Sequence, residues 1–395
     1  MPQWTQGYPT MRLAEADRQA RQARTRAWLP GLGHLILGRW ERGIRLILFT
    51  LGVVLLMVWQ WDRFFGAFST PFLDRWVASI FLILLLPVAV WTSRRDVGRL
   101  LRDRETTLPG KSPWQVAMRR FRRNRLAVYS IYLILFFYAA AILAPILAPF
   151  DPSAIPDVMA NRYLSPSRLH PFGTDEFGRD LLSRALYGGR VSLSVGLLAM
   201  IIAKTVGTTY GAVSAYFGGI VDAIMMRILD VWIAFPTFYL MLMLVGVFEA
   251  SILMLVLILG FTAWPGTARF IRGEILSLKN QQFTEAARAI GLPAHQIILK
   301  HLIPSALSPV LVTAALAVAG MIGAEAGLSF LGLGIRPPTP SWGNMVSAGS
   351  DNLLNAWWVA FFPGSLLTLT LISFSLLADG LRDALDPKAL TQKYV

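Results

Sequence analysis

The sequence contains no cysteine and few charged residues for its length. None of its 395 residues is cysteine, 15% are charged and 55% are hydrophobic. The absence of cysteine excludes disulfide bonds, thiol catalysis and thiolate metal ligands. Soluble domains are typically about 25% charged, so the composition also excludes an ordinary soluble chain and indicates a membrane protein.

Catalytic and cofactor motifs are missing as well. The four histidines are scattered, and His295 and His301 lie six residues apart, which is not the i, i+4 spacing of a helical metal site. The stretch from Pro109 to Ser112 resembles the end of a phosphate-binding loop, but Glu105 stands where such a loop needs its first glycine. We therefore expect no catalytic site, no metal site and no cofactor in this chain.

Hydrophobic runs long enough to cross the bilayer are frequent. A helix needs about 20 mostly apolar residues to span the hydrocarbon core. Six runs meet this length, at about 126–148, 191–215, 223–248, 251–270, 307–330 and 357–378. Two shorter runs, at about 46–61 and 76–92, are flanked by tryptophan and predict a preliminary hairpin. A pair of interfacial or re-entrant helices is the alternative for these two runs.

The placement of basic residues predicts the orientation. The formal net charge is +14, and arginines crowd residues 93–125, whereas residues 63–75 contain few. Because basic loops stay on the inner side, we expect both termini in the cytoplasm and the chain in a bacterial-type inner membrane. Arginines beside the bilayer face anionic lipid headgroups, so lipids account for the charge and no nucleic-acid partner is expected.

A polar segment between the fourth and fifth runs predicts two short helices. Residues 284–290 read as the first helix, and Gly291 fits the left-handed position after a helix end. Pro293 fits the first turn of a second helix at 294–302, which is amphipathic and which we expect Pro304 to stop.

The first of these helices carries a compact group of side chains. Ala286 and Ala287 follow Glu285 and would leave a flat knob with one acidic group, suited to a groove on a partner protein. A plain interfacial hairpin fits the same residues equally well.

These residues resemble the EAA loop of ABC importer permeases. The match comprises Glu285, Ala286, Ala287, Gly291 and the pair Ile303 and Pro304; Ile303 stands where the consensus has leucine. Further stretches are similar to the C-type subunits of the dipeptide, oligopeptide and nickel permease family: 117–125, 170–187, 218–236, 325–342 and 379–388. The resemblance covers about residues 111–391.

The resemblance implies an all-α polytopic fold of the type I importer kind. A six-span permease domain would occupy residues 111–395, with an external cap at about 150–190 and a coupling loop at about 269–304. The resemblance does not cover residues 1–110, which we expect to form an extension with a basic cytoplasmic tail and the two short hydrophobic runs. Added membrane anchoring and contact with a partner subunit are the two open interpretations of this extension.

The resemblance also implies partners and a cargo. It implies a paralogous permease subunit, two cytoplasmic ATPases that bind ATP and Mg, and an extracytoplasmic solute-binding protein. Dipeptides or oligopeptides would be the cargo, with nickel or another small solute as the alternative. An ion-driven secondary transporter is a different class of answer, but it would leave the polar hairpin without a purpose.

Three groups of residues are the candidate sites. The ATPase-coupling residues are Glu285 as anchor, Ala286 and Ala287 as packing surface, Gly291 as bend, with Pro293 and Pro304. Contacts to the binding protein are expected at Asp175, Glu176, Arg179 and Asp180, with turn and N-cap chemistry as the other interpretation of this segment.

The third group consists of ionisable residues inside the spans, which are costly in lipid and mark pores or structural pairs. They are Lys204, Arg227, Asp230 and Glu325. We expect Asp222 to snorkel or to pair with Arg227, Asp230 to lie on the face of Arg227, and Glu325 to meet Lys204 or to line the passage. Structural pairing is favoured over contact with the cargo.

Overall fold

The protein is mainly helical in the part that the computed structural model describes, which is residues 22–59 without 24 and 38, 73–105, 113–248 without 156, and 251–385. The chain divides into two compact units, Met1–Lys111 and Ser112–Val395.

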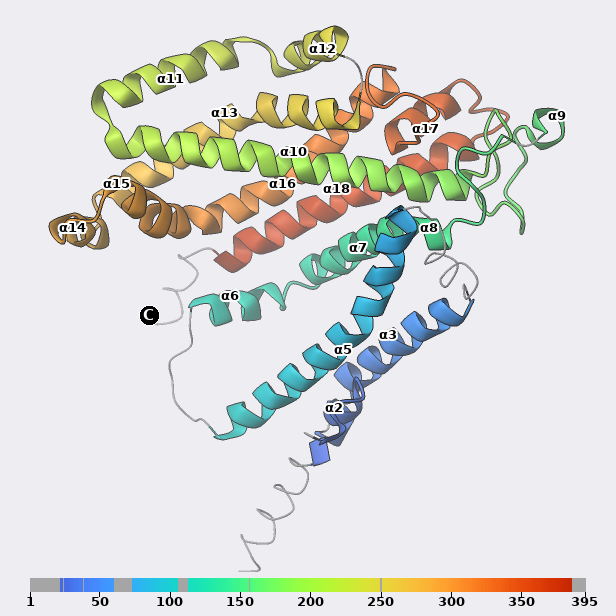
Figure 1. Ribbon diagram of the computed structural model, residues 1–395, viewed down its shortest axis with the longest axis horizontal. Helices are drawn as coiled ribbons and strands as arrows, with labels where there is room; N and C mark the ends of the chain where they lie inside the picture. The colour runs from blue at the N-terminus through green and yellow to red at the C-terminus, as the bar shows by residue number, and fades with distance from the viewer. Residues whose placement is uncertain are drawn as a thin grey trace, which may run out of the picture. The chain divides into compact units, whose positions relative to one another are not determined.

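The first unit is a helical hairpin with a short helix packed at its base. Helix α2 (Leu32–Ile36) precedes α3 (Trp40–Trp59), and α5 (Leu73–Glu105) returns alongside (Figure 1). The segment Val77–Val97 of α5 is long and apolar enough to span a membrane. Helix α3 begins with Glu41, Arg42 and Arg45 and does not meet the same criterion.

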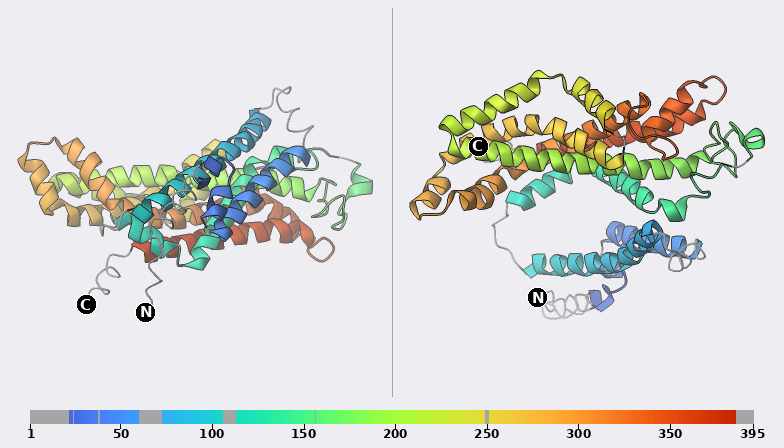
Figure 2. Two further views of the ribbon diagram at one scale, coloured as in Figure 1. Left: turned by 90° about the horizontal axis from the view of Figure 1, so that it is seen from below. Right: turned by 45° about the horizontal axis from the view of Figure 1, so that its top comes forward.

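The second unit begins with short helices and then forms a bundle. The short helices are α6 (Pro113–Phe121), α8 (Ala144–Leu147) and α9 (Val158–Asn161), and α7 (Arg125–Ile142) is the first long one. The bundle comprises α10 (Leu181–Phe217), α13 (Ile252–Lys279), α16 (Ile303–Phe330), α17 (Trp342–Ser350) and α18 (Trp358–Leu385). Helices α10, α13 and α16 run side by side in all views (Figure 2).

Close packing of α10 on α13 depends on glycine. A Cβ atom on Gly211 would lie 2.3 Å from the carbonyl oxygen of Ala268, and one on Gly207 would lie 2.6 Å from that of Trp264. Only glycine at these positions lets the two backbones approach so closely. Small residues of this kind are common where membrane helices pack together. Helix α10 is thereby held close to α13 along this stretch.

One predicted span is bent rather than straight. The run predicted at 223–248 forms α11 (Gly219–Ala234) and α12 (Thr237–Val247), which meet at 79°. Phe235 and Pro236 lie between them, with ψ of 127° and 120°. The proline ring disfavours the helical conformation at Phe235, and its nitrogen donates no hydrogen bond. In Figure 1, α11 diverges from α10 and α13.

The number of spans agrees with the predicted fold class. Six helical segments of the described chain are long and apolar enough to cross a membrane, or seven if the bent pair α11 and α12 forms one span. Five of the six main predicted runs are single helices in this set, and the remaining run is the bent pair. The all-α, multi-span prediction is therefore confirmed.

Candidate coupling site

A polar bent hairpin joins α13 to α16 at one end of the second unit (Figure 1). It consists of α14 (Gln282–Ala289), the single turn α15 (Ala294–Gln296) and a π-helical segment η2 (Ile297–Leu302). We call residues 282–302 the coupling hairpin. It corresponds to the part of the sequence in which two short helices were expected.

The bend of the coupling hairpin follows from Gly291. Its φ is +80°, its N–H donates to the carbonyl of Arg288 at 2.9 Å, and the N–H of Leu292 donates to that of Ala287 at 3.1 Å. These two bonds form a Schellman motif, which requires a left-handed residue after the helix. The space beside Gly291 is open, so its backbone conformation alone selects glycine. The predicted bend is confirmed.

Pro304 does not stop the second helix, and that expectation was wrong. Residues 294–330 form one helical run, with Pro304 in the first turn of α16. The wider π-helical turns of η2 immediately precede the proline, and the N–H of Ile303 donates to the carbonyl of Ile298, five residues back. A wide turn separates the proline ring from the carbonyl it would otherwise meet, so the helix continues. The hairpin is thus continuous with α16.

The inner face of the coupling hairpin is packed against the bundle. One apolar cluster joins the hairpin to three long helices: Ala212 and Ala215 of α10, Ile271 and Ile275 of α13, Ala287, Ile297, Ile298 and Leu302 of the hairpin, and Ala306 and Val310 of α16. One polar contact adds to it, because Thr284 donates to the carbonyl of Leu278 at 2.9 Å. Beside the hairpin, Lys279 of α13 donates to the carbonyl of Ala215 of α10 at 3.2 Å. The hairpin is therefore attached to α10, α13 and α16 as one body.

The outer face of the coupling hairpin is exposed. Glu285 and Ala286 are exposed, and so is Ile290, at 76%. Ala287 lies on the opposite face and is only 4% exposed. The prediction that Ala287 belongs to the partner-facing surface is thus corrected: on a helix, residues 285 and 286 point away from the core that residue 287 enters.

The intramembrane charges have partners other than those expected. Lys204 of α10 donates to the hydroxyls of Thr267 at 3.2 Å and Thr313 at 3.0 Å, so it joins α13 and α16. It does not pair with Glu325. The distance along α10 explains this, because Ser192, the residue of α10 that Glu325 contacts, lies about three turns from Lys204.

Glu325 holds a buried polar network rather than lining an open passage. Its side chain is 0% exposed and accepts hydrogen bonds from Ser192 at 2.8 Å and Ser329 at 2.7 Å. The Ser192 hydroxyl accepts from the N–H of Trp342, and the Ser329 hydroxyl accepts from that of Ile335. The network joins α10, α16 and the start of α17. The preference for a structural role is supported here.

The acidic residues of α11 pair with α13. Asp222 receives two hydrogen bonds from Arg272, at 2.7 and 2.5 Å, and one from Ser214; Asp230 pairs with Arg269 at 2.7 Å. The proposed pair of Asp222 with Arg227 is therefore incorrect. Arg227 is exposed, and no ion-pair partner for it occurs in the described residues.

Sequence reasoning missed Arg269 and Arg272. It assigned residues after 268 to a cytoplasmic loop, whereas α13 continues to Lys279. Arg269 and Arg272 lie three apart, on one face of a helix, and the spacing of these two arginines is the signal that could have identified both.

The external segment uses its charges internally. The Asp175 carboxylate accepts from Arg179 Nε at 2.7 Å and lies 3.3 Å from Arg184 Nε. Asp180 caps α10 by accepting from the N–H of Ser183 at 2.8 Å, and it contacts His170 Nδ1 at 2.9 Å. These contacts are the turn and N-cap chemistry that was the alternative interpretation.

The burial of these residues corrects the expected contacts with a binding protein. Asp175, Arg179 and Asp180 are 4%, 6% and 3% exposed, and only Glu176 is half-buried. Arg179 and Arg184 neutralise the Asp175 carboxylate. Burying a paired carboxylate costs less free energy than burying an unpaired one. Of the four predicted residues, Glu176 alone is accessible to a partner.

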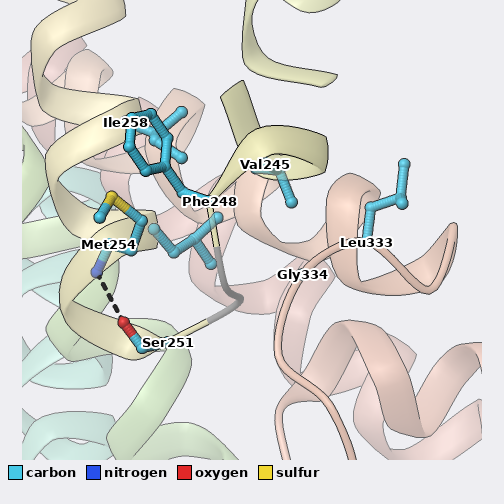
Figure 3. Close-up of a pocket in the computed structure, with 8 residues that line it drawn as sticks. Val245, Phe248, Ser251, Met254, Ile258, Leu333 and Gly334 are labelled. Atoms are coloured by element: carbon cyan, nitrogen blue, oxygen red, sulfur yellow. Dashed lines mark hydrogen bonds between the residues drawn. The ribbon is translucent and has the colours of Figure 1, made fainter. Parts of the chain in front are cut away.

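A small apolar pocket lies among the end of α12, the start of α13 and the loop after α16 (Figure 3). Val245, Phe248 and Leu333 line it, and the hydroxyl of Ser251 at its base caps α13 by accepting from the N–H of Met254 at 3.1 Å. It has no charged lining residue and offers nothing to fix a charged ligand. Within the described ranges, no group of three or more metal-ligating side chains occurs either.

The fold and the site define a class of protein. A bundle of membrane-length helices with a polar bent hairpin packed against three of them is a multi-pass membrane transport component. The chain belongs to the family of binding-protein-dependent transport system inner membrane components, whose family model matches residues 207–391. Residues 112–166 match the N-terminal TM domain of oligopeptide transport permease C.

Curated relatives agree with this family. The chain is 45% identical over 287 residues to the oligopeptide transport system permease protein OppC of Haemophilus influenzae, covering 73% of this chain and 92% of the relative. It is 40% identical to the dipeptide transport system permease protein DppC of Bacillus subtilis, covering 71% and 87%. It is 39% identical to the glutathione transport system permease protein GsiD of Escherichia coli, covering 70% and 91%. The membership predicted from the motifs is confirmed.

Proposed function

We propose that this chain is the pore-forming permease subunit of an ATP-driven importer for short peptides. The relatives named above are permeases for oligopeptides, dipeptides and glutathione, which favours peptide cargo over nickel. The single observation that carries the mechanism is the two-faced coupling hairpin. Its inner face is fused to α10, α13 and α16, and its outer face presents Glu285 and Ala286.

The coupling hairpin transmits work as a rigid lever. An apolar cluster and the continuous run of residues 294–330 leave little freedom between the hairpin and α16. Displacement of α14 by a partner therefore displaces the inner ends of α13 and α16, and access to the pore alternates. Gly291 sets the angle of α14, Pro293 begins the second short helix, and Pro304 lies where η2 continues into α16.

The partners follow from the chemistry that the chain lacks and from the faces that it exposes. Two cytoplasmic ATPases bind ATP and Mg, and their surface contacts Glu285 of the coupling hairpin. This chain itself is non-catalytic. A solute-binding protein delivers cargo on the outer side, as the family description implies, and reaches Glu176 on the cap.

A paralogous permease subunit covers α11. Leu229 is the one buried residue of α11, while its apolar side chains, Arg227 and Asp230 are exposed. Ionised groups are costly in contact with lipid, so a second permease at this face lowers the free energy of the assembly.

The orientation follows from the same assignment. The exposed arginines around the junction of α6 and α7 support an inner position for this end, because basic loops stay on the inner side. The coupling hairpin then faces the cytoplasm, and both termini lie there.

Reconstitution tests the proposal. The permease pair and its ATPases are placed in vesicles, and ATP-dependent uptake of a labelled dipeptide is measured with the binding protein outside. Unlabelled peptides should compete and nickel should not. Uptake that continues without ATP or ATPases, driven by an ion gradient, would overturn the proposal.

Charge reversal at the hairpin tests the docking surface. In the Glu285→Lys variant, co-purification of the ATPases should fall by about fivefold or more, because an attraction at the interface becomes a repulsion. Glu274→Lys on α13 makes the same charge reversal outside the hairpin and serves as the matched control. Equal losses in both variants would argue against docking through Glu285.

A further inference from the structure

The first unit lies outside both family matches, which fall within residues 112–391. Its described part nevertheless contains a cluster of polar side chains in contact with one another. Asp96 of α5 contacts Nε2 of the fully buried His34 of α2 at 3.2 Å and accepts from Arg42 of α3 at 3.2 Å. One carboxylate therefore joins three helices at one level.

Two glycines bring these helices together. Gly31 has φ of +91°, and a Cβ there would lie 2.3 Å from the carbonyl oxygen of Gly43. A Cβ on Gly43 would lie 2.6 Å from a methyl group of Leu35. The N–H of Gly31 also donates to the Ser93 hydroxyl at 3.4 Å. In the first unit, α2 therefore packs closely against α3 and α5.

Arginines and tryptophans surround this core on the outside. The guanidinium of Arg94 lies 3.9 Å from the ring centre of Trp28, and that of Arg95 lies 4.8 Å from that of Trp91. Exposed Arg39 and Arg45 stand at the start of α3. We call Arg39, Arg45, Arg94 and Arg95 the arginine collar. In the ranges that the structure describes, none of the four has a carboxylate partner.

The exposed side chains next to the collar change from aromatic to aliphatic with distance from it, as the surface of a membrane protein does from the interface to the hydrocarbon core. Trp28, Trp40 and Trp91 are 61%, 64% and 57% exposed at the level of the collar. Beyond them the two helices expose apolar side chains: Leu48, Leu51, Leu55 and Val58 on α3, and Val77, Ile80, Leu84 and Val88 on α5. Hydrocarbon, aromatic belt and basic residues in succession match acyl chains, interface and phosphates.

We propose that the arginine collar binds the phosphate groups of anionic phospholipids. Guanidinium groups bind phosphate with two parallel hydrogen bonds, and stacking on tryptophan orients Arg94 and Arg95 before the lipid arrives. Arg42 of α3 is joined to Asp96 of α5, and the four arginines lie within three residues of one or the other along the chain, so that several contribute together. Each basic residue near an anionic surface strengthens binding by roughly fivefold.

Native mass spectrometry of the full-length chain tests the collar. Binding of phosphatidylglycerol and of phosphatidylcholine is compared for the wild type and for the quadruple variant Arg39→Gln, Arg45→Gln, Arg94→Gln and Arg95→Gln. Phosphatidylglycerol should bind at least tenfold more weakly to the variant, and phosphatidylcholine should bind equally well. Unchanged affinity for phosphatidylglycerol would overturn the proposal.

A second quadruple variant controls for total charge. Arg119, Arg122, Arg123 and Arg125 are also exposed, and changing all four to glutamine removes the same charge from the second unit. The affinity of this variant for phosphatidylglycerol should fall by less than that of the collar variant, because these arginines lie around one helix junction and not around a carboxylate that joins three helices. An equal loss in both variants would reject a defined site. If the collar variant fails to fold, the pairs Arg39→Gln with Arg45→Gln and Arg94→Gln with Arg95→Gln are measured, each expected to lose about threefold or more.

An acidic protein segment is the competing occupant of the collar. Loss of a co-purifying subunit from the collar variant, with lipid affinity retained, would identify that occupant and overturn the proposal.

Discussion

The coupling hairpin and the external cap are both polar segments between long helices, yet they use their charges in opposite ways. The cap folds Asp175, Arg179 and Asp180 inward until they are nearly inaccessible. The coupling hairpin buries Ala287 and leaves Glu285 exposed. The cap pairs its charged side chains with one another, which stabilises its own fold. The coupling hairpin instead presents an exposed carboxylate on a rigid base, where a partner protein can bind it.

Removing the buried carboxylate of the cap should have the largest effect. In Asp175→Ala, two buried guanidinium groups, Arg179 and Arg184, lose their counter-charge, which costs about 3–5 kcal/mol. We expect the purified protein to unfold at a much lower temperature and to accumulate poorly in the membrane.

The neighbouring residue gives the control for this change. Glu176 is half-buried with no ion pair among the described residues, so Glu176→Ala should leave the unfolding temperature nearly unchanged. Similar stability of both variants would show that the cap is not held by its internal charges, and the contrast with the hairpin would fail.

Changing the bend of the hairpin should have the next largest effect. Gly291→Val forces a β-branched residue into a left-handed conformation, at a cost of roughly 1–2 kcal/mol that a shift of α14 relieves. We expect ATP-dependent uptake to fall by about tenfold while ATP hydrolysis by the complex continues.

Gly273→Val is the matched control for the bend. Gly273 is exposed on α13 with open space around it and an ordinary helical conformation. Its uptake should stay within about twofold of the wild type. Coupled uptake at the normal rate in Gly291→Val would remove the lever mechanism.

The two regions also show which features a sequence can reveal. The bend at Gly291 was predictable because a Schellman motif is local and needs only glycine after a short helix. The continuation through Pro304 was not, because a π-helical turn has no clear sequence signal. The ion-pair partners of Asp175 and Asp222 depend on the tertiary packing. The sequence shows that these residues are charged, but it does not show which side chains lie beside them.

Breaking the inner attachment of the hairpin should have a smaller effect than changing its bend. Thr284→Val removes the hydrogen bond to the carbonyl of Leu278, which costs about 1 kcal/mol, but it keeps the shape of the buried side chain. Hydrogen exchange of α14 should increase, and uptake should fall by about two- to fivefold. Thr209→Val, an exposed position on α10, should change neither quantity. Faster exchange without any loss of uptake would show that the lever need not be rigid.

Neutralising the outer charge should have the smallest effect. Glu285→Gln keeps the size and hydrogen-bonding capacity of an exposed side chain and removes one charge, which at a solvent-accessible interface is worth about 0.2–1 kcal/mol. The affinity for the ATPases, measured by titration in detergent, should fall by roughly two- to fivefold at low salt and by less at high salt, because ions screen such contacts. Glu274→Gln should show no comparable salt-dependent loss. A salt-independent affinity in both the wild type and the variant would mean that the partner reads only the shape of the hairpin, with Ala286 and Ile290 as its contacts, and that the exposed carboxylate has no part in docking.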